Sequence, residues 1–169
     1  MGWNSGKLEV PPTTDLTHPS PMSLSRREMD WITETIAIGN YLDAQDEELR
    51  RSQGIRSMIC LNGRLSGVKA SELGLDALQN YAFNDGPGND PAIFQRAVEA
   101  VRGFSKSYPK LLVQCHAGRS RSAVLVTGHL MLAKGWSSDE ALAFVASKRE
   151  IALTPGIDRL LHSAFLRKS

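Results

Sequence analysis

Short apolar runs alternate with amphipathic segments along this chain from about residue 29 onward. The runs with the length and residue types of buried β-strands are 57–61, 77–83 and 110–115, and further short apolar runs lie within 31–38. Helical patterns occupy 43–52 and 123–134, and others begin near 90, 137 and 155. Strands interleaved with such helices predict an α/β fold, with a mostly parallel central sheet of about four to five strands flanked by helices on both faces.

Residues that start and stop helices support these boundaries. Asp90 followed by Pro91 suits the cap and first turn of a helix. Gly135 stands where the preceding helix is expected to end, and Ser137 with Glu140 has the spacing of a capping box for the next one. The long helical segments are therefore delimited by the sequence itself.

The first 28 residues differ in composition from the rest of the chain. Four of the eight prolines occur there among serine, threonine and asparagine, a composition typical of linkers and poorly ordered arms. We therefore divide the chain into a proline- and serine-rich arm, 1–28, and one folded domain, 29–169.

Overall composition narrows the class of protein. With 41% apolar and 22% charged residues, the chain is typical of globular domains. A net charge of +2 does not provide the broad basic surface of a nucleic-acid binder, so we expect no nucleic-acid partner. No apolar run is long enough for a membrane span, and no leader pattern is present. The two cysteines, Cys60 and Cys115, fit a reducing compartment, and we expect a cytoplasmic location.

The segment from Cys115 to Ser122 joins a predicted strand to a predicted helix and carries the candidate chemistry. In such a loop, backbone N–H groups converge and the helix N-terminus adds partial positive charge, which suits a phosphate dianion. This field also favours the thiolate form of Cys115, the candidate nucleophile. Arg121, six residues later, offers a planar fork to two phosphate oxygens. Ser122 can donate a hydrogen bond to the sulfur. We expect phosphate to be bound by His116, Ala117, Gly118, Arg119, Ser120 and Arg121.

The spacing of cysteine and arginine alone is weak evidence, because it also arises by chance. The apolar run before the cysteine, the glycine inside the loop and the apolar helix beyond it make the combination much more specific.

Phosphate ester cleavage also needs an acid to protonate the leaving oxygen. Asp85 lies 30 residues before Cys115, in a glycine- and proline-rich loop that follows a predicted strand. Because adjacent parallel strands bring their following loops to one edge of the sheet, we assign Asp85 as general acid and then as base for water. Asp90 is the nearby alternative, although its place before Pro91 favours a helix cap.

The run from Val113 to Ala123 resembles the signature of the cysteine-dependent dual-specificity protein phosphatases of the protein tyrosine phosphatase superfamily. Segments 32–34 and 38–42 resemble the opening of that catalytic domain, and the likeness covers about residues 30–166. It implies that 29–169 is a catalytic domain that hydrolyses phosphotyrosine and phosphoserine/threonine proteins through a phosphocysteine, without a cofactor. The family's nucleophile, phosphate-binding arginine, hydroxyl and acid match Cys115, Arg121, Ser122 and Asp85.

One position departs from the family pattern. Gln114 stands where relatives usually have a histidine that helps to hold and polarise the thiolate. Glutamine can donate a hydrogen bond but carries no charge, so we expect the thiolate to form less readily here than in typical relatives.

Two other functions remain open at this point. Phosphoinositide and phosphatidylglycerophosphate phosphatases of the same superfamily have basic residues at the positions of His116 and Arg119, and 117–122 together with 154–156 is similar to the latter branch. A phospholipid substrate is therefore the alternative. A non-catalytic module that only binds phosphate is a further one.

The remaining candidate groups have simpler interpretations. Cys60 lies in an apolar run and is expected to be a buried, inert thiol. The alternative is a reversible disulfide with Cys115, a device that some members of the family use. No group of histidines and cysteines has metal-ligand spacing, so we expect no metal site.

Overall fold

The computed structural model describes residues 29–167, so the predicted arm at 1–28 lies outside the described residues. Five strands form one sheet in the order β1-β2-β5-β3-β4, in which β1 is antiparallel to β2 and all other neighbours are parallel. This confirms the predicted sheet. The strands are β1 (Asp30–Trp31), β2 (Ile36–Gly39), β3 (Ser57–Cys60), β4 (Ala77–Asn80) and β5 (Leu111–Gln114).

The helices follow the predicted order with shifted boundaries. They are α1 (Tyr41–Gln45), α2 (Glu47–Ser52), α3 (Pro91–Ser107), α4 (Arg121–Lys134) and α5 (Ser138–Lys148), with 3₁₀ helices at Ala70–Leu73, Ile157–His162 and Ala164–Leu166. The single helix predicted at 43–52 is wrong, because Asp46 takes an extended conformation and caps α2 through its side chain. The helix α4 begins two residues earlier than predicted.

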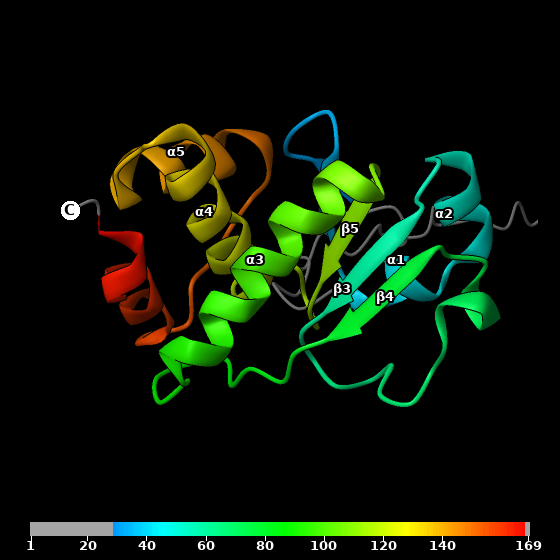
Figure 1. The fold of residues 1–169 in the computed structure, drawn as a ribbon, viewed down its shortest axis with the longest axis horizontal. Coiled ribbons are helices and arrows are strands. Elements are labelled where there is room, and N and C mark those ends of the chain that lie inside the picture. The colour runs from blue at the N-terminus through cyan, green and yellow to red at the C-terminus, as the bar shows by residue number, and fades with distance from the viewer. Residues whose placement is uncertain (1–28, 168–169) are drawn as a thin grey trace, which may run out of the picture.

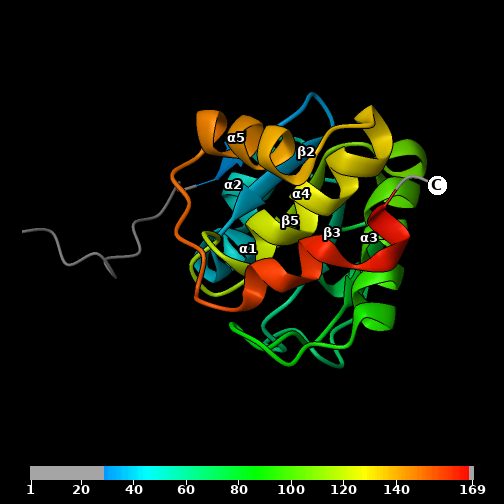
Figure 2. The same ribbon diagram turned by 90° about the vertical axis from the view of Figure 1, so that its left-hand side faces the viewer.

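Helices cover both faces of the sheet (Figures 1 and 2), as the alternation of strands and helices predicts. Successive residues of a strand point to opposite faces. Ile59 and Val113 therefore pack in the core formed with α3, α4 and α5, whereas Met58 and Leu112 pack in a second core with α1. Two apolar layers thus fix the sheet from both sides.

The central strand β5 carries the candidate loop at its carboxyl end. Gln114, the last residue of β5, is level with Gly39 of β2 on one side and with Cys60 of β3 on the other. The parallel strands therefore end at one edge, and the segments that follow them meet there.

The strand predicted at 77–83 ends earlier, at Asn80. Beyond it, the backbone N–H of Tyr81 still donates to the carbonyl of Cys60, at 2.9 Å, and that of Phe83 donates to Leu61, at 3.4 Å. These two bonds lead the chain along β3 toward Asp85, at the edge where β5 also ends. No helix in the described part of the chain is long and apolar enough to cross a membrane.

Candidate active site

Cys115 lies at the base of the loop between β5 and α4. Its side chain is buried, and its Sγ accepts a hydrogen bond from the backbone N–H of Gly118 at 3.2 Å. Ser120 precedes the first turn of α4, so the loop closes directly onto a helix N-terminus. A backbone donor and a helix N-terminus both favour negative charge at this sulfur.

Gly118 allows the loop to lie against the end of β2. Gly118 has a φ of 67°, and a Cβ at this position would lie 2.5 Å from the carbonyl oxygen of Gly39. A larger residue at Gly118 would therefore push the loop away from the sheet.

Arg149, which the sequence interpretation missed, supports the loop from behind. It follows α5 and is only 6% exposed. Its Nε donates to the carbonyl of Gly118 at 2.6 Å, and one terminal nitrogen donates to Ala117 at 3.3 Å. The other terminal nitrogen forms an ion pair with Asp30 at 2.9 Å. In a trans peptide C=O and N–H point in opposite directions. The contact to Ala117 therefore turns the N–H of Gly118 toward Cys115.

Arg121 begins α4 and reaches across the strand ends. Its Nη1 donates to the carbonyls of Leu61, at 3.4 Å, and Phe83, at 3.3 Å. Its Nε is buried without a partner among the described residues, and so is the hydroxyl of Ser122. The expected bond from Ser122 to the sulfur of Cys115 is therefore not formed in this structure. Buried donors without a partner are costly, so both are available to a ligand.

Asp85 lies beside the candidate phosphate loop, residues 115–122, as predicted. One of its carboxylate oxygens, Oδ1, accepts a hydrogen bond from the hydroxyl of Ser120 at 2.6 Å. Asp90, the alternative acid, instead accepts the backbone N–H of Ala92 at 2.9 Å and caps α3. The structure thus brings Asp85 into the site and gives Asp90 the structural role that its sequence context favours.

Aromatic and basic side chains form one wall of the site. His116, expected at the rim, stacks on Tyr41 with ring centroids 4.8 Å apart. The guanidinium of Arg64 lies 4.4 Å from the centroid of the same tyrosine ring. Arg119, the other expected rim residue, is half-buried, and its carbonyl accepts the N–H of Ala152. Tyr41 and Arg64 were missed, since no local pattern links them to the loop.

Gln114 and Cys60 lie behind the loop. The Gln114 amide is buried and donates to Oδ1 of Asn62 at 3.3 Å. Burial raises the pKa of the neighbouring Cys60 thiol to about 11, which fits the inert role expected for it. Both Cys60 and Cys115 are free thiols in this structure.

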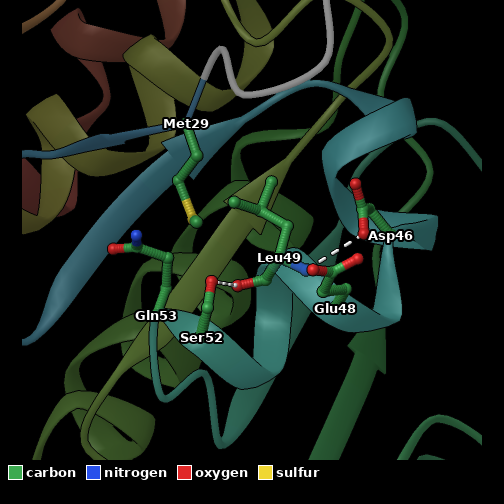
Figure 3. Close-up of a pocket in the computed structure, with 6 residues that line it drawn as sticks. All are labelled: Met29, Asp46, Glu48, Leu49, Ser52 and Gln53. Atoms are coloured by element: carbon green, nitrogen blue, oxygen red, sulfur yellow. Dashed lines mark hydrogen bonds between the residues drawn. The ribbon is translucent and has the colours of Figure 1, made fainter.

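A separate cavity of about 320 Å³ opens beside α2 (Figure 3). It is lined by Met29, Asp46, Glu48, Leu49, Ser52 and Gln53. The side chains of Asp46 and Ser52 are engaged by the backbone of Leu49. None of the lining residues belongs to the phosphate loop or to the Asp85 loop, so this cavity is not the candidate site.

Comparisons with known proteins agree with this geometry. The family model described as "Dual specificity phosphatase, catalytic domain" matches residues 81–161, which include Asp85 and the whole phosphate loop. The chain is similar to the protein-tyrosine-phosphatase IBR5 of Arabidopsis thaliana, with 27% identity over 83% of the chain and 51% of that protein. It is also similar to mouse dual specificity protein phosphatase 26, with 34% identity over 73% of the chain and 62% of that protein. The chain thus spans about half to two thirds of the length of these relatives.

A solved structure has the same fold. A mouse putative dual specificity phosphatase, crystallised with zinc tungstate, superposes with a TM-score of 0.70 and 27% identity, covering 87% of this chain and 90% of that one. Together with the cysteine loop between a central parallel strand and a helix N-terminus, these likenesses support a member of the protein tyrosine phosphatase superfamily. Within that superfamily, the family model and the relatives support the dual specificity phosphatases.

Proposed function

We propose that the protein hydrolyses phosphomonoesters through a phosphocysteine intermediate, with phosphotyrosine and phosphoserine/threonine proteins as substrates. The observation that carries the proposal is one contact. The hydroxyl of Ser120, a residue of the phosphate loop, lies 2.6 Å from the carboxylate of Asp85. A nucleophile loop and an acid from another loop thus meet at one edge of the sheet, as ester cleavage requires.

In the first step, the Cys115 thiolate attacks phosphorus and forms an S–P bond. The P–O bond to the leaving group breaks, and the leaving oxygen takes its proton from Asp85. The loop N–H groups and Arg121 stabilise the charge on the transferring phosphoryl oxygens. The buried Nε of Arg121, without a protein partner, supports this role.

In the second step, water attacks phosphorus and gives a proton to the Asp85 carboxylate. The S–P bond breaks, which releases inorganic phosphate and restores the thiolate. The hydroxyl of Ser122, buried and free of other partners, donates to the departing sulfur. In this proposal, Ser122 forms its hydrogen bond to the sulfur during the second step and not in the resting site.

A phospholipid is the alternative substrate. The wall of Arg64, Tyr41 and His116 favours it, because an exposed guanidinium next to the loop offers a second anion site to a lipid headgroup that carries more than one phosphate. A protein substrate is preferred because the charge of the whole chain is nearly balanced at +2.

The deciding experiment is a substrate panel. Purified protein is assayed on phosphotyrosine and phosphoserine peptides, phosphoinositides and phosphatidylglycerophosphate, with Cys115→Ser as the control. We expect Cys115-dependent turnover of the phosphopeptides. Faster Cys115-dependent turnover of a lipid would transfer the proposal to the alternative. Binding of phosphopeptides without any turnover would identify a non-catalytic phosphate-binding module.

A cytoplasmic location forms part of the proposal. A nucleophilic thiol works only where it is kept reduced, and Cys60 and Cys115 are both free thiols in the structure.

A further inference from the structure

Ser120 stands at the N-cap position of α4 but does not cap the helix. A serine at this position usually accepts a hydrogen bond from a backbone N–H of the first turn. Here the side chain makes no such bond. Instead, the hydroxyl donates to Asp85 at 2.6 Å and accepts from the backbone N–H of Thr154 at 3.0 Å. The polar side chain at this cap therefore serves contacts outside its own helix.

The hydrogen-bonding capacity of the hydroxyl fixes the direction of these contacts. A serine hydroxyl has one proton and two lone pairs. Because the N–H of Thr154 can only donate, it occupies a lone pair of Ser120. The single proton of Ser120 then points to Oδ1 of Asp85, and the distance of 2.6 Å is typical of a bond to a charged oxygen. The bond to Ser120 takes up one lone pair of Oδ1, which favours Oδ2 as the oxygen that carries and exchanges the proton.

The loop of Asp85 needs such an anchor. Asp85 is exposed, and Gly86 and Gly88, which follow it closely, both have positive φ. The Asn89 side chain fixes the loop backbone through bonds to Asn84 and Gly86. Among the described residues, the carboxylate of Asp85 itself is held only by Ser120. The position of the Asp85 side chain, on which proton transfer depends, is thus set by the hydroxyl of Ser120.

We propose that Ser120 is the positioning residue for the general acid: it holds Oδ1 of Asp85 so that Oδ2 delivers the proton to the leaving oxygen. The proposal rests on the proposed function and deepens it. It differs from phosphate binding, the role expected for Ser120 from the loop sequence.

The test uses two substrates that differ in their need for the acid. Phenyl phosphate has a poor leaving group, whereas p-nitrophenyl phosphate has a good one that departs with little protonation. We expect Ser120→Ala to lower kcat about tenfold on phenyl phosphate and less than about twofold on p-nitrophenyl phosphate. Inhibition by vanadate, which reports on the phosphate loop, should stay within about twofold of the parent.

A double-mutant cycle separates positioning from general damage. If Ser120 acts through Asp85, adding Ser120→Ala to Asp85→Ala should change kcat on phenyl phosphate by less than about twofold. Equal losses on both substrates, or losses that multiply in the double variant, would overturn the proposal.

Ser137→Ala is the matched control. Ser137 caps α5 by accepting a hydrogen bond from the backbone N–H of Glu140, and it lies outside the site. Its substitution removes the same hydroxyl group as Ser120→Ala. It should leave the ratio of the two substrates unchanged. A parent enzyme without Cys115-dependent turnover would overturn the proposed function and this inference together, whereas an active parent with an insensitive Ser120→Ala would overturn the inference alone.

Discussion

The two cysteines of this protein lie at the ends of adjacent parallel strands, yet their surroundings differ. Cys60 is the last residue of β3, and Cys115 follows the last residue of β5. Burial does not distinguish them, since Cys60 is 0% and Cys115 is 2% exposed. What differs is the backbone around each sulfur.

Cys60 is still within the regular strand and packs among apolar side chains on the α1 face. Its environment offers little to a thiolate, and burial raises its pKa to about 11. One residue beyond its own strand, Cys115 meets the N–H of Gly118 and the start of α4. The turn after β5, which brings a backbone donor and a helix N-terminus to the sulfur, therefore distinguishes Cys115 from Cys60.

The first prediction tests this contrast directly. We expect Cys115→Ser to lower kcat by about four orders of magnitude or more, since residues 115–122 contain no second thiol, whereas Cys60→Ala should retain activity within about threefold. In the native protein, iodoacetamide should modify Cys115 at pH 7. Cys60 should stay unmodified at pH 9, because its pKa is about 11. Peptide mapping by mass spectrometry identifies the modified thiol, and labelling of Cys60 first would contradict the comparison.

The second prediction concerns the arginine that completes the Cys115 loop. Arg121→Lys keeps the charge but loses the Nε donor and the planar fork, so kcat/KM should fall by about 10² to 10³. Arg102→Lys, on the exposed side of α3, makes the same exchange and should have no effect on kcat/KM. Steady-state assays on p-nitrophenyl phosphate measure both. If kcat/KM of Arg121→Lys falls by less than about tenfold, Arg121 contributes mainly its charge and not its planar fork.

Much of this contrast could be predicted from the sequence, since it depends on local patterns. Apolar runs and cap residues located β5 and α4, so the position of Cys115 between them followed. Asp85 could be predicted as well, because parallel strands place their following loops at one edge. Asp90 could be assigned as a helix cap, and not as the acid, because Pro91 follows it.

What could not be predicted depends on contacts between distant segments. A basic residue at the end of a helix normally interacts with the last carbonyls, so the sequence around Arg149 carried no sign that it reaches the Cys115 loop. The break between α1 and α2 was missed because Asp46 is compatible with a helical pattern until its capping geometry is seen. The bond between Ser120 and Asp85 likewise spans 35 residues.

The third prediction tests the support that Arg149 gives to the Cys115 loop. Arg149→Met removes the donors to Gly118 and Ala117 and leaves their carbonyls unsatisfied in a buried place. We expect the free energy of unfolding to fall by about 3 kcal/mol and kcat/KM by about tenfold, the latter because the N–H of Gly118 is no longer held toward Cys115. Urea denaturation and steady-state kinetics measure the two effects.

Asp30→Asn is the matched control for Arg149, because it removes the half-exposed partner of the ion pair and keeps the loop contacts. Its cost should be below about 1 kcal/mol, with unchanged kcat/KM. If Asp30→Asn lowers kcat/KM as much as Arg149→Met, activity depends on the ion pair and not on the contacts of Arg149 with the loop.

The fourth prediction, the smallest in effect, concerns Gln114, which precedes Cys115 in the chain and is level with Cys60 across the sheet. Gln114→His introduces a side chain that can carry positive charge, which favours a thiolate nearby. We expect iodoacetamide to modify Cys115 about threefold to tenfold faster at pH 6 in this variant. Asn62→Ala, which removes the acceptor of the Gln114 amide and of the Arg64 backbone N–H, should change that rate by less than about twofold, because it adds no charge.

This substitution also probes the limit of the comparison, because Gln114 is level with Cys60 across the sheet and directly precedes Cys115 in the chain. If backbone donors decide reactivity, Cys115 gains and Cys60 stays unmodified, since a single neighbouring charge does not replace the amide and the helix N-terminus that Cys60 lacks. If both thiols react faster to a similar degree, the neighbouring side chain, and not the turn after β5, sets thiol reactivity. Alkylation rates of the two peptides from one sample distinguish these outcomes, because each thiol serves as the reference for the other.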